Sequence, residues 1–242
     1  MMKNDYDGLH VVVTGATGAL GAAVVMRLVE RGATCHVPAR SPAAGDRFAD
    51  APSDRVHVQT AIDLTDESSV VGFYDTLPRI WASIHCAGGF AMAPIAETTL
   101  DDFSRMWAMN VTSVFLCSRE AVRVFRTTRS TATQDPGGRI VNVAARAALE
   151  PRTGGGMSSY TATKAAVAGI TLALAEELAG ENILVNAVAP SIIDTEANRR
   201  AMPGADFSKW ATVDEIAETI LFLASPSNRA TRGGVVPVYG KS

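Results

Sequence analysis

The sequence predicts one α/β domain built on a doubly wound, mostly parallel sheet of seven strands that is flanked by helices. Short runs rich in β-branched residues alternate along the chain with longer runs rich in Ala, Leu and Glu, a pattern typical of βαβ units. A glycine-rich turn joins the first of these strands to the first helix. No stretch has the composition of an interdomain linker and no internal repeat is found, so residues 1–242 are expected to form a single domain.

Seven apolar runs predict the strands. The first, LHVVVT, is almost wholly apolar and β-branched, as expected of a strand that is buried on both faces, whereas the third, RVHVQTA, alternates. The predicted strands cover residues 9–14, 33–38, 55–61, 80–86, 139–144, 183–188 and 235–239.

Five longer runs between these strands predict helices. Gly32 follows the first helix and suits its C-cap, and Thr65 is the expected N-cap of the second. The polar residues 127–138 are expected to form a surface loop. The order of elements is that of a Rossmann-like fold, with helices at about residues 19–31, 66–77, 100–125, 160–180 and 212–224.

Composition limits the class of partner. Hydrophobic residues make up 47% and charged residues 19% of the chain, and the net charge is −3, so there is no basic surface for nucleic acid or an anionic membrane. No apolar run reaches the roughly 18 residues of a membrane span, and the charged start does not resemble a signal peptide. The scattered Cys35, Cys86 and Cys117 are expected to be core thiols. We expect a cytoplasmic protein that acts on a small molecule.

The glycine-rich turn predicts a nucleotide-binding site. In the run TGATGALG, Gly15, Thr17, Gly18, Leu20 and Gly21 lie between a predicted strand and a predicted helix, where glycines let the backbone approach a pyrophosphate. The helix N-terminus adds free N–H donors and the positive end of its dipole.

Two residues bear on the choice of nucleotide. NAD sites usually carry an acid after the second strand, but this chain has Arg40 there and no carboxylate before Asp46. Arg40 suits a 2′-phosphate, which favours NADP over NAD; the alternative is a loop arginine without a ligand. Asp63 either accepts from an adenine amino group or caps the next turn.

Tyr160 and Lys164 are the candidate catalytic pair. Residues four apart on a helix share one face, so both side chains can enter one pocket. A nearby ammonium favours the phenolate, and we therefore expect Lys164 to lower the pKa of Tyr160 towards the range of a general acid at neutral pH. A tyrosine and a lysine at this spacing also occur on ordinary solvated helix faces.

Taken together, the motifs resemble the short-chain dehydrogenase/reductase family over nearly the whole chain. The resemblance implies hydride transfer with a nicotinamide cofactor and Tyr160 as proton donor. It implies that Lys164 binds the nicotinamide ribose, that Asn110 holds a water in a proton relay to Lys164, and that Thr195 contacts the carboxamide. The matching segments are TGATGALG, Asp63-Leu64, Ala87-Gly88, Asn110-Val111, RIVNVA, Tyr160-x-x-x-Lys164, NAVAP ending at Pro190, and Ile193-x-Thr195.

The chain departs from the family at the position of its usual catalytic serine. Ala145 stands there, three residues after Asn142, and the nearest hydroxyl before the Tyr160 helix is that of Thr153. This replacement, an A-G-G after the fourth strand, and the later motif D-T-x-x-N-R-x-x-M-P-x-A-D-F-x-x-W are similar to dihydropteridine reductases. Arg40 does not fit that branch, which favours NADH.

Three functions follow from the missing hydroxyl. The first is reduction of an acceptor that tolerates its loss, such as a quinonoid pterin. The second is an ordinary carbonyl or 3-oxoacyl reductase in which water or Thr153 substitutes. The third is a nucleotide-binding module with little turnover.

Two further expectations concern the substrate and assembly. Residues 191–211 lie where this fold carries a substrate lid, with Met202, Phe207 and Trp210 as apolar contacts and Arg199 and Arg200 for an acidic substrate; a core or solvated role is equally compatible. The small residues Ala165, Ala168 and Ala173 on the Tyr160 helix suit packing against a second copy or against the chain's own sheet. We expect a homodimer or homotetramer.

Overall fold

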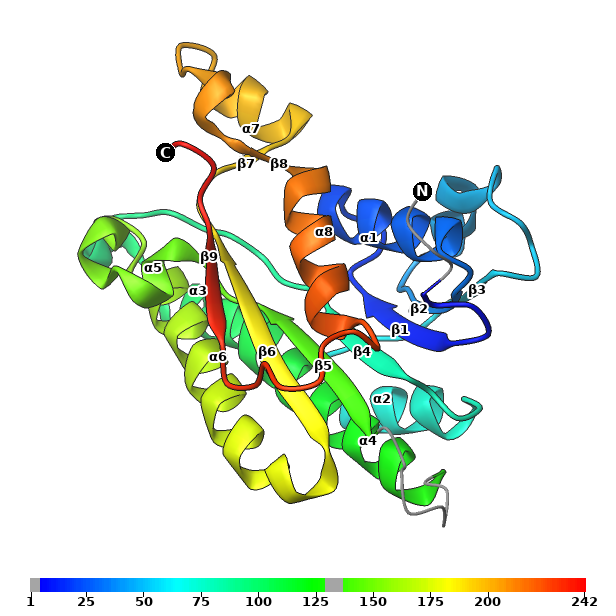
Figure 1. Cartoon of the computed structure of the whole chain (residues 1–242). Helices are drawn as coiled ribbons and strands as arrows, with labels where there is room; N and C mark the ends of the chain where they lie inside the picture. The colour runs from blue at the N-terminus through cyan, green and yellow to red at the C-terminus, as the bar shows by residue number, and fades with distance from the viewer. Residues whose placement is uncertain (1–4, 129–136) are drawn as a thin grey trace.

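The computed structural model describes residues 5–128 and 137–242, and it contains the parallel sheet that the sequence predicts (Figure 1). Seven strands lie in the order β3-β2-β1-β4-β5-β6-β9, and all neighbouring strands are parallel. The chain order reverses between β1 and β4, so the sheet is doubly wound and the predicted fold class is confirmed. The strands are β1 (His10–Thr14), β2 (Thr34–Pro38), β3 (Val56–Gln59), β4 (Ala82–His85), β5 (Gly138–Val143), β6 (Ile183–Pro190) and β9 (Val235–Val238).

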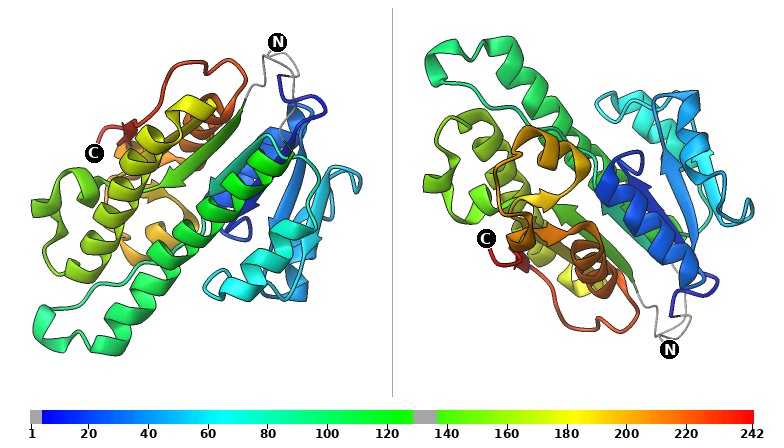
Figure 2. Two further views of the ribbon diagram at one scale, coloured as in Figure 1. Left: turned by 90° about the horizontal axis from the view of Figure 1, so that it is seen from below. Right: turned by 90° about the horizontal axis from the view of Figure 1, so that it is seen from above.

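Helices cover both faces of the sheet (Figure 2). One face carries α1 (Ala19–Glu30) and α8 (Val213–Ala224), and the other carries α2 (Glu67–Asp75), α4 (Ser113–Thr127) and α6 (Ser158–Glu177). Along β1, Val11 and Val13 belong to the first apolar core, whereas Val12 belongs to the second. The continuous apolar run at 9–14 therefore reflects burial on both faces.

A buried chain of hydrogen bonds joins β4 and β5 to the helices of the second face. Tyr74 Oη lies 2.8 Å from Ser83 Oγ, which lies 2.9 Å from His85 Nε2. His85 Nδ1 lies 2.8 Å from Asn142 Oδ1, and Asn142 Nδ2 donates to Thr171 Oγ1 at 2.9 Å. Because Thr171 donates its own proton to a main-chain carbonyl of α6, the Asn142 oxygen faces His85, whose Nδ1 carries the proton.

Two helix predictions are corrected. The helix expected over 100–125 consists of α3 (Leu100–Trp107) and α4, separated by a π-helical segment, η3 (Ala108–Thr112). The N-cap of α2 is Asp66, which accepts from the Ser69 N–H at 2.7 Å, and not Thr65. Most of the loop expected at 127–138 lies outside the described residues.

Residues 191–211 protrude beyond the carboxyl edge of the sheet (Figure 1). The short strands β7 (Ile193–Asp194) and β8 (Ala211–Thr212) pair in parallel there, with α7 (Glu196–Ala201) and η6 (Phe207–Lys209) between them. The shorter remaining elements are η1 (Pro42–Phe48), η2 (Ile95–Glu97), α5 (Arg146–Leu149), η4 (Pro151–Gly154) and η5 (Ala179–Glu181). None of the described helices has the length and apolar character that crossing a membrane requires.

Candidate active site

The glycine-rich turn meets the turn after β4 at the switch point of the sheet. Gly15 has φ +66°, and a Cβ on it would lie 2.5 Å from the Ala87 nitrogen. A Cβ on Gly21 would lie 2.4 Å from the Gly15 oxygen. These two glycines therefore permit backbone contacts that no other residue allows, which brings β1, α1 and β4 together at one edge.

The outer side of the same turn is open. Thr17 and Gly18 are exposed, while Leu20 packs against the first core. Gly18 is the N-cap of α1 and offers no side chain to its N–H groups. An exposed glycine turn with an uncapped helix start fits the pyrophosphate of a dinucleotide.

Tyr160 and Lys164 lie together at this edge, at the start of α6. Lys164 is buried, and its Nζ lies 5.9 Å from the centroid of the Tyr160 ring. The ammonium donates to the Val143 carbonyl at 2.8 Å. The Tyr160 hydroxyl has no hydrogen-bond partner among residues 5–128 and 137–242.

The pKa values of this pair correct one prediction. Burial raises the pKa of Tyr160 to about 12 and lowers the pKa of Lys164 to about 8. The expected lowering of the Tyr160 pKa by Lys164 is wrong for the chain alone, because the ammonium is directed at Val143 while burial disfavours the phenolate.

Asn110 clamps the backbone in front of this pair. Its Oδ1 accepts from the Gly89 N–H at 2.7 Å and its Nδ2 donates to the Gly89 carbonyl at 3.1 Å. Nδ2 also lies 3.0 Å from Thr163 Oγ1. A Cβ on Gly88 would lie 2.6 Å from Asn110 Oδ1 and 3.5 Å from Lys164 Nζ, so Gly88 admits both side chains. The π-helical segment places Asn110 at this point, and such segments are frequent at functional sites.

The Thr153 hydroxyl does not take the place of the missing serine. Ala145 is buried, directly after β5, in extended backbone with φ −162°. The Thr153 hydroxyl donates to the Glu150 carbonyl at 2.8 Å and is exposed in η4.

The adenine-side residues lie at the ends of β2 and β3. Arg40 is exposed, and no hydrogen bond or ion pair joins it to the described part of the chain. Asp63 Oδ1 accepts from the Thr65 N–H at 2.9 Å and from its hydroxyl at 2.8 Å, so Asp63 caps the turn. Leu64 packs against the second core.

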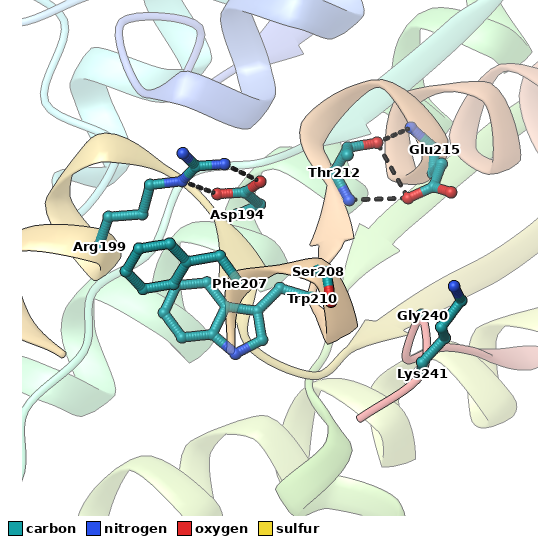
Figure 3. A pocket seen from close by; sticks show the side chains of 9 residues that line it. All are labelled: Asp194, Arg199, Phe207, Ser208, Trp210, Thr212, Glu215, Gly240 and Lys241. Carbon is teal, nitrogen blue, oxygen red and sulfur yellow. Dashed lines mark hydrogen bonds and ion pairs between the residues drawn. The ribbon is translucent and has the colours of Figure 1, made fainter. Parts of the chain in front are cut away.

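The lid residues lie beyond the end of β6, where Pro190 is buried. Ile193 starts β7, and Thr195 caps α7 by accepting from the Asn198 N–H at 3.2 Å. Arg199 forms a two-pronged ion pair with Asp194 at 2.6 and 2.7 Å (Figure 3). Of the other lid residues that the sequence singles out, Trp210 is buried, Phe207 and Met202 are partly buried, and Arg200 pairs with Glu196.

Sequence reasoning missed three residues of the site. Thr163 links Asn110 to the Tyr160 carbonyl, to which it donates at 2.8 Å. The Val143 carbonyl holds Lys164. Phe90 packs edge to face against Tyr160, with ring centroids 5.0 Å apart and an interplanar angle of 77°. Only Phe90 carries a sequence signal, as a large apolar residue directly after Ala87-Gly88-Gly89.

A doubly wound sheet with an open glycine turn and a tyrosine–lysine pair at its switch point defines a nucleotide-dependent oxidoreductase. The chain belongs to the short-chain dehydrogenase/reductase family, whose sequence profile, described as short chain dehydrogenase, matches residues 9–205. The predicted family and enzyme class are confirmed.

Curated relatives match over nearly the whole chain. A cis-4-hydroxycyclohexanecarboxylate dehydrogenase from Sinomonas cyclohexanicum is 33% identical over 95% of this chain and 94% of its own. A 2,3-dihydro-2,3-dihydroxybenzoate dehydrogenase from Escherichia coli K12 is 30% identical, covering 91% of each. A 3-oxoacyl-[acyl-carrier-protein] reductase from Aquifex aeolicus is 28% identical over 99% of each.

Solved structures share the fold. One named as a short chain dehydrogenase/reductase family protein has a TM-score of 0.87 at 26% identity, covering 98% of this chain and 97% of its own. The NADP-bound structure of ElxO has a TM-score of 0.85 at 24% identity, covering 96% and 97%.

Proposed function

We propose that this chain transfers a hydride between NADP and a small-molecule substrate, with Tyr160 as the proton donor in the reductive direction. The observation that carries the proposal is the state of the Tyr160 hydroxyl. It has no partner in the described part of the chain, and its raised pKa of about 12 keeps it protonated at neutral pH. A protonated donor beside the buried ammonium of Lys164 is what reduction requires.

The residues at the carboxyl edge fit such a cofactor, which supplies the hydride when bound. Arg40, exposed and unpaired among the described residues, supports binding of a 2′-phosphate and hence NADP over NAD. The fold shared with NADP-bound ElxO supports the same class of cofactor. We assign the cofactor site to Gly15, Thr17, Gly18, Leu20 and Gly21 at the phosphates, Arg40, Asp63 and Leu64 at the adenosine, and Ala87, Gly88, Tyr160, Lys164, Pro190, Ile193 and Thr195 at the nicotinamide half.

Tyr160, Lys164 and Asn110 each have a separate role in proton transfer. Tyr160 donates its proton to the substrate atom that receives negative charge. Lys164 returns a proton to the phenolate that remains, because its pKa of about 8 lets it hold or pass a proton near neutral pH. Asn110 holds the relay water that returns the proton to Lys164.

Two acceptor classes are compatible with this chemistry. The buried, apolar Ala145 favours an acceptor that needs no second donor on its oxygen, such as a quinonoid pterin. The Aquifex relative favours a carbonyl or 3-oxoacyl substrate. We further propose a homo-oligomer; Ala165 and Ala173 are exposed on α6 and available for packing, whereas Ala168 is buried in its own chain.

The proposal is tested by titrating the protein with NADPH and NADH side by side, and then measuring turnover with quinonoid dihydropterin and with a β-keto ester. Tighter binding of NADPH, with consumption of either acceptor, is the expected result. Binding without turnover on either acceptor contradicts the proposed reaction, and tighter binding of NADH contradicts the role of Arg40.

A further inference from the structure

Phe90 has an unusual combination of position and exposure. Its ring packs against Tyr160, yet 62% of the residue is exposed. Its own chain therefore buries little of this large aromatic side chain, which lies directly beside a proton donor. The free surface of Phe90 is available to the substrate that Tyr160 protonates.

The backbone holds Phe90 in place through a closed circuit of contacts. Asn110 binds both polar groups of Gly89, the residue before Phe90. Asn110 also contacts Thr163, which donates to the Tyr160 carbonyl. The ring contact between Phe90 and Tyr160 closes the circuit, so the two rings have a defined relative position.

The loop that carries Phe90 also exposes a methionine. Met92 is 64% exposed two residues further on, and the Ala93 N–H donates to the Gly156 carbonyl at 2.9 Å, which ties this loop to the approach of α6. The two loops border a pocket of about 190 Å³ whose lining extends to Ser159, the residue before Tyr160, and includes neither Phe90 nor Tyr160. It is smaller than the roughly 300–1,000 Å³ of a drug-sized site. Its lining includes three methionines, Met92, Met106 and Met157, together with the polar residues Thr98, Asp102, Ser158 and Ser159.

We propose that Phe90 is a specificity-determining residue that binds the face of the substrate, and that the substrate is an alcohol or ketone whose reacting carbon belongs to a small apolar ring. The inference rests on the proposed function, because it places the reacting carbon beside Tyr160. A flat or puckered ring covers the exposed face of Phe90, whereas an open chain of the same size does so only after losing rotational freedom.

The test compares two C6 ketones, cyclohexanone and 2-hexanone, with NADPH. Wild type should prefer cyclohexanone in kcat/KM. Phe90→Ala should lose about five- to tenfold in kcat/KM for cyclohexanone, mainly through KM, and change little with 2-hexanone. Phe222→Ala is the matched control, since Phe222 is 54% exposed on α8, and should change neither value. Equal losses on both ketones, or no loss on either, would overturn the inference.

A second readout does not depend on turnover. The chain has four tyrosines, so 3-fluorotyrosine labelling gives four ¹⁹F signals, and the one lost in Tyr160→Phe is that of Tyr160. With NADP⁺ present, cyclohexanone should shift this signal in wild type and shift it much less in Phe90→Ala. An equal shift in both proteins, or none in wild type, would overturn the inference. If wild type consumes NADPH with neither ketone, the ¹⁹F titration still decides whether Phe90 binds a ring beside Tyr160, whereas the proposed function fails only if quinonoid dihydropterin and the β-keto ester are left unreduced as well.

Discussion

Lys164 donates a hydrogen bond of 2.8 Å to the main-chain carbonyl of Val143, two residues before Ala145. The ammonium is thereby held at the end of β5, where it is buried and forms no ion pair with a carboxylate of the described residues. Burial lowers the pKa of Lys164 to about 8. The ammonium therefore stays charged at neutral pH although it has lost its contact with water, which costs free energy.

Replacing the Lys164 ammonium should lower activity without lowering the stability of the fold. We expect Lys164→Met to reduce kcat/KM by about a hundredfold or more, because a preorganised charge is lost. The melting temperature should stay unchanged or rise, since an apolar side chain replaces a desolvated charge. Lys241→Met, at an exposed site outside the lid segment 191–211, is the control for both assays. A large loss of stability in Lys164→Met would show that Lys164 is chiefly structural.

Arg40 should determine the choice of nucleotide. Arg40→Ala should raise the Kd for NADPH by about ten- to a hundredfold, through loss of charge-assisted hydrogen bonds, and leave that for NADH unchanged. Fluorescence titration measures both constants, with the exposed Arg229→Ala as the control. Equal weakening of both nucleotides would place Arg40 away from the 2′-phosphate.

Ala145→Ser should restore a missing donor. If the substrate is a ketone, turnover should rise about tenfold or more, the size of effect that one positioned donor has on a developing oxyanion. Ala145→Cys has a similar volume and a much weaker donor, so it should not reproduce the gain. Absence of a gain in the serine variant would count against the carbonyl-reductase alternative.

His85 should make the protein sensitive to acid. Burial lowers its pKa from 6.5 to about 4, so the unfolded chain binds the proton more readily and stability falls as the pH drops from about 6.5 to about 4. The difference between these values corresponds to about 3 kcal/mol. Urea unfolding at pH 7 and pH 4 should show this loss in wild type and a smaller one in His85→Asn. His36, whose pKa burial also lowers to about 4, leaves a residual slope in both proteins. Identical pH dependence in the two proteins would contradict the assignment.

The sheet was predictable because each strand carries its own signal. The run at residues 9–14 is apolar on both faces, and Gly15 and Gly21 occur where a side chain would collide with backbone. The positions of Tyr160 and Lys164 on one helix face follow from their spacing of four residues.

The remaining features depend on contacts between distant segments. The π-helical segment interrupts a run whose local pattern is helical throughout, and its Asn110 is fixed by Gly89 and Thr163. The direction of the Lys164 ammonium depends on Val143, twenty-one residues away in the chain. The rise in the Tyr160 pKa reflects burial, which no spacing rule contains.

The central claim is that Tyr160 donates the proton during hydride transfer, and Tyr160→Phe tests it most directly. NADPH binding and NADPH consumption with a turned-over ketone should be measured for wild type and variant together. The hydroxyl has no partner in the described residues, so the variant should fold and bind NADPH as wild type does, while kcat falls by about a hundred- to ten-thousandfold. Turnover within a few fold of wild type would contradict the account.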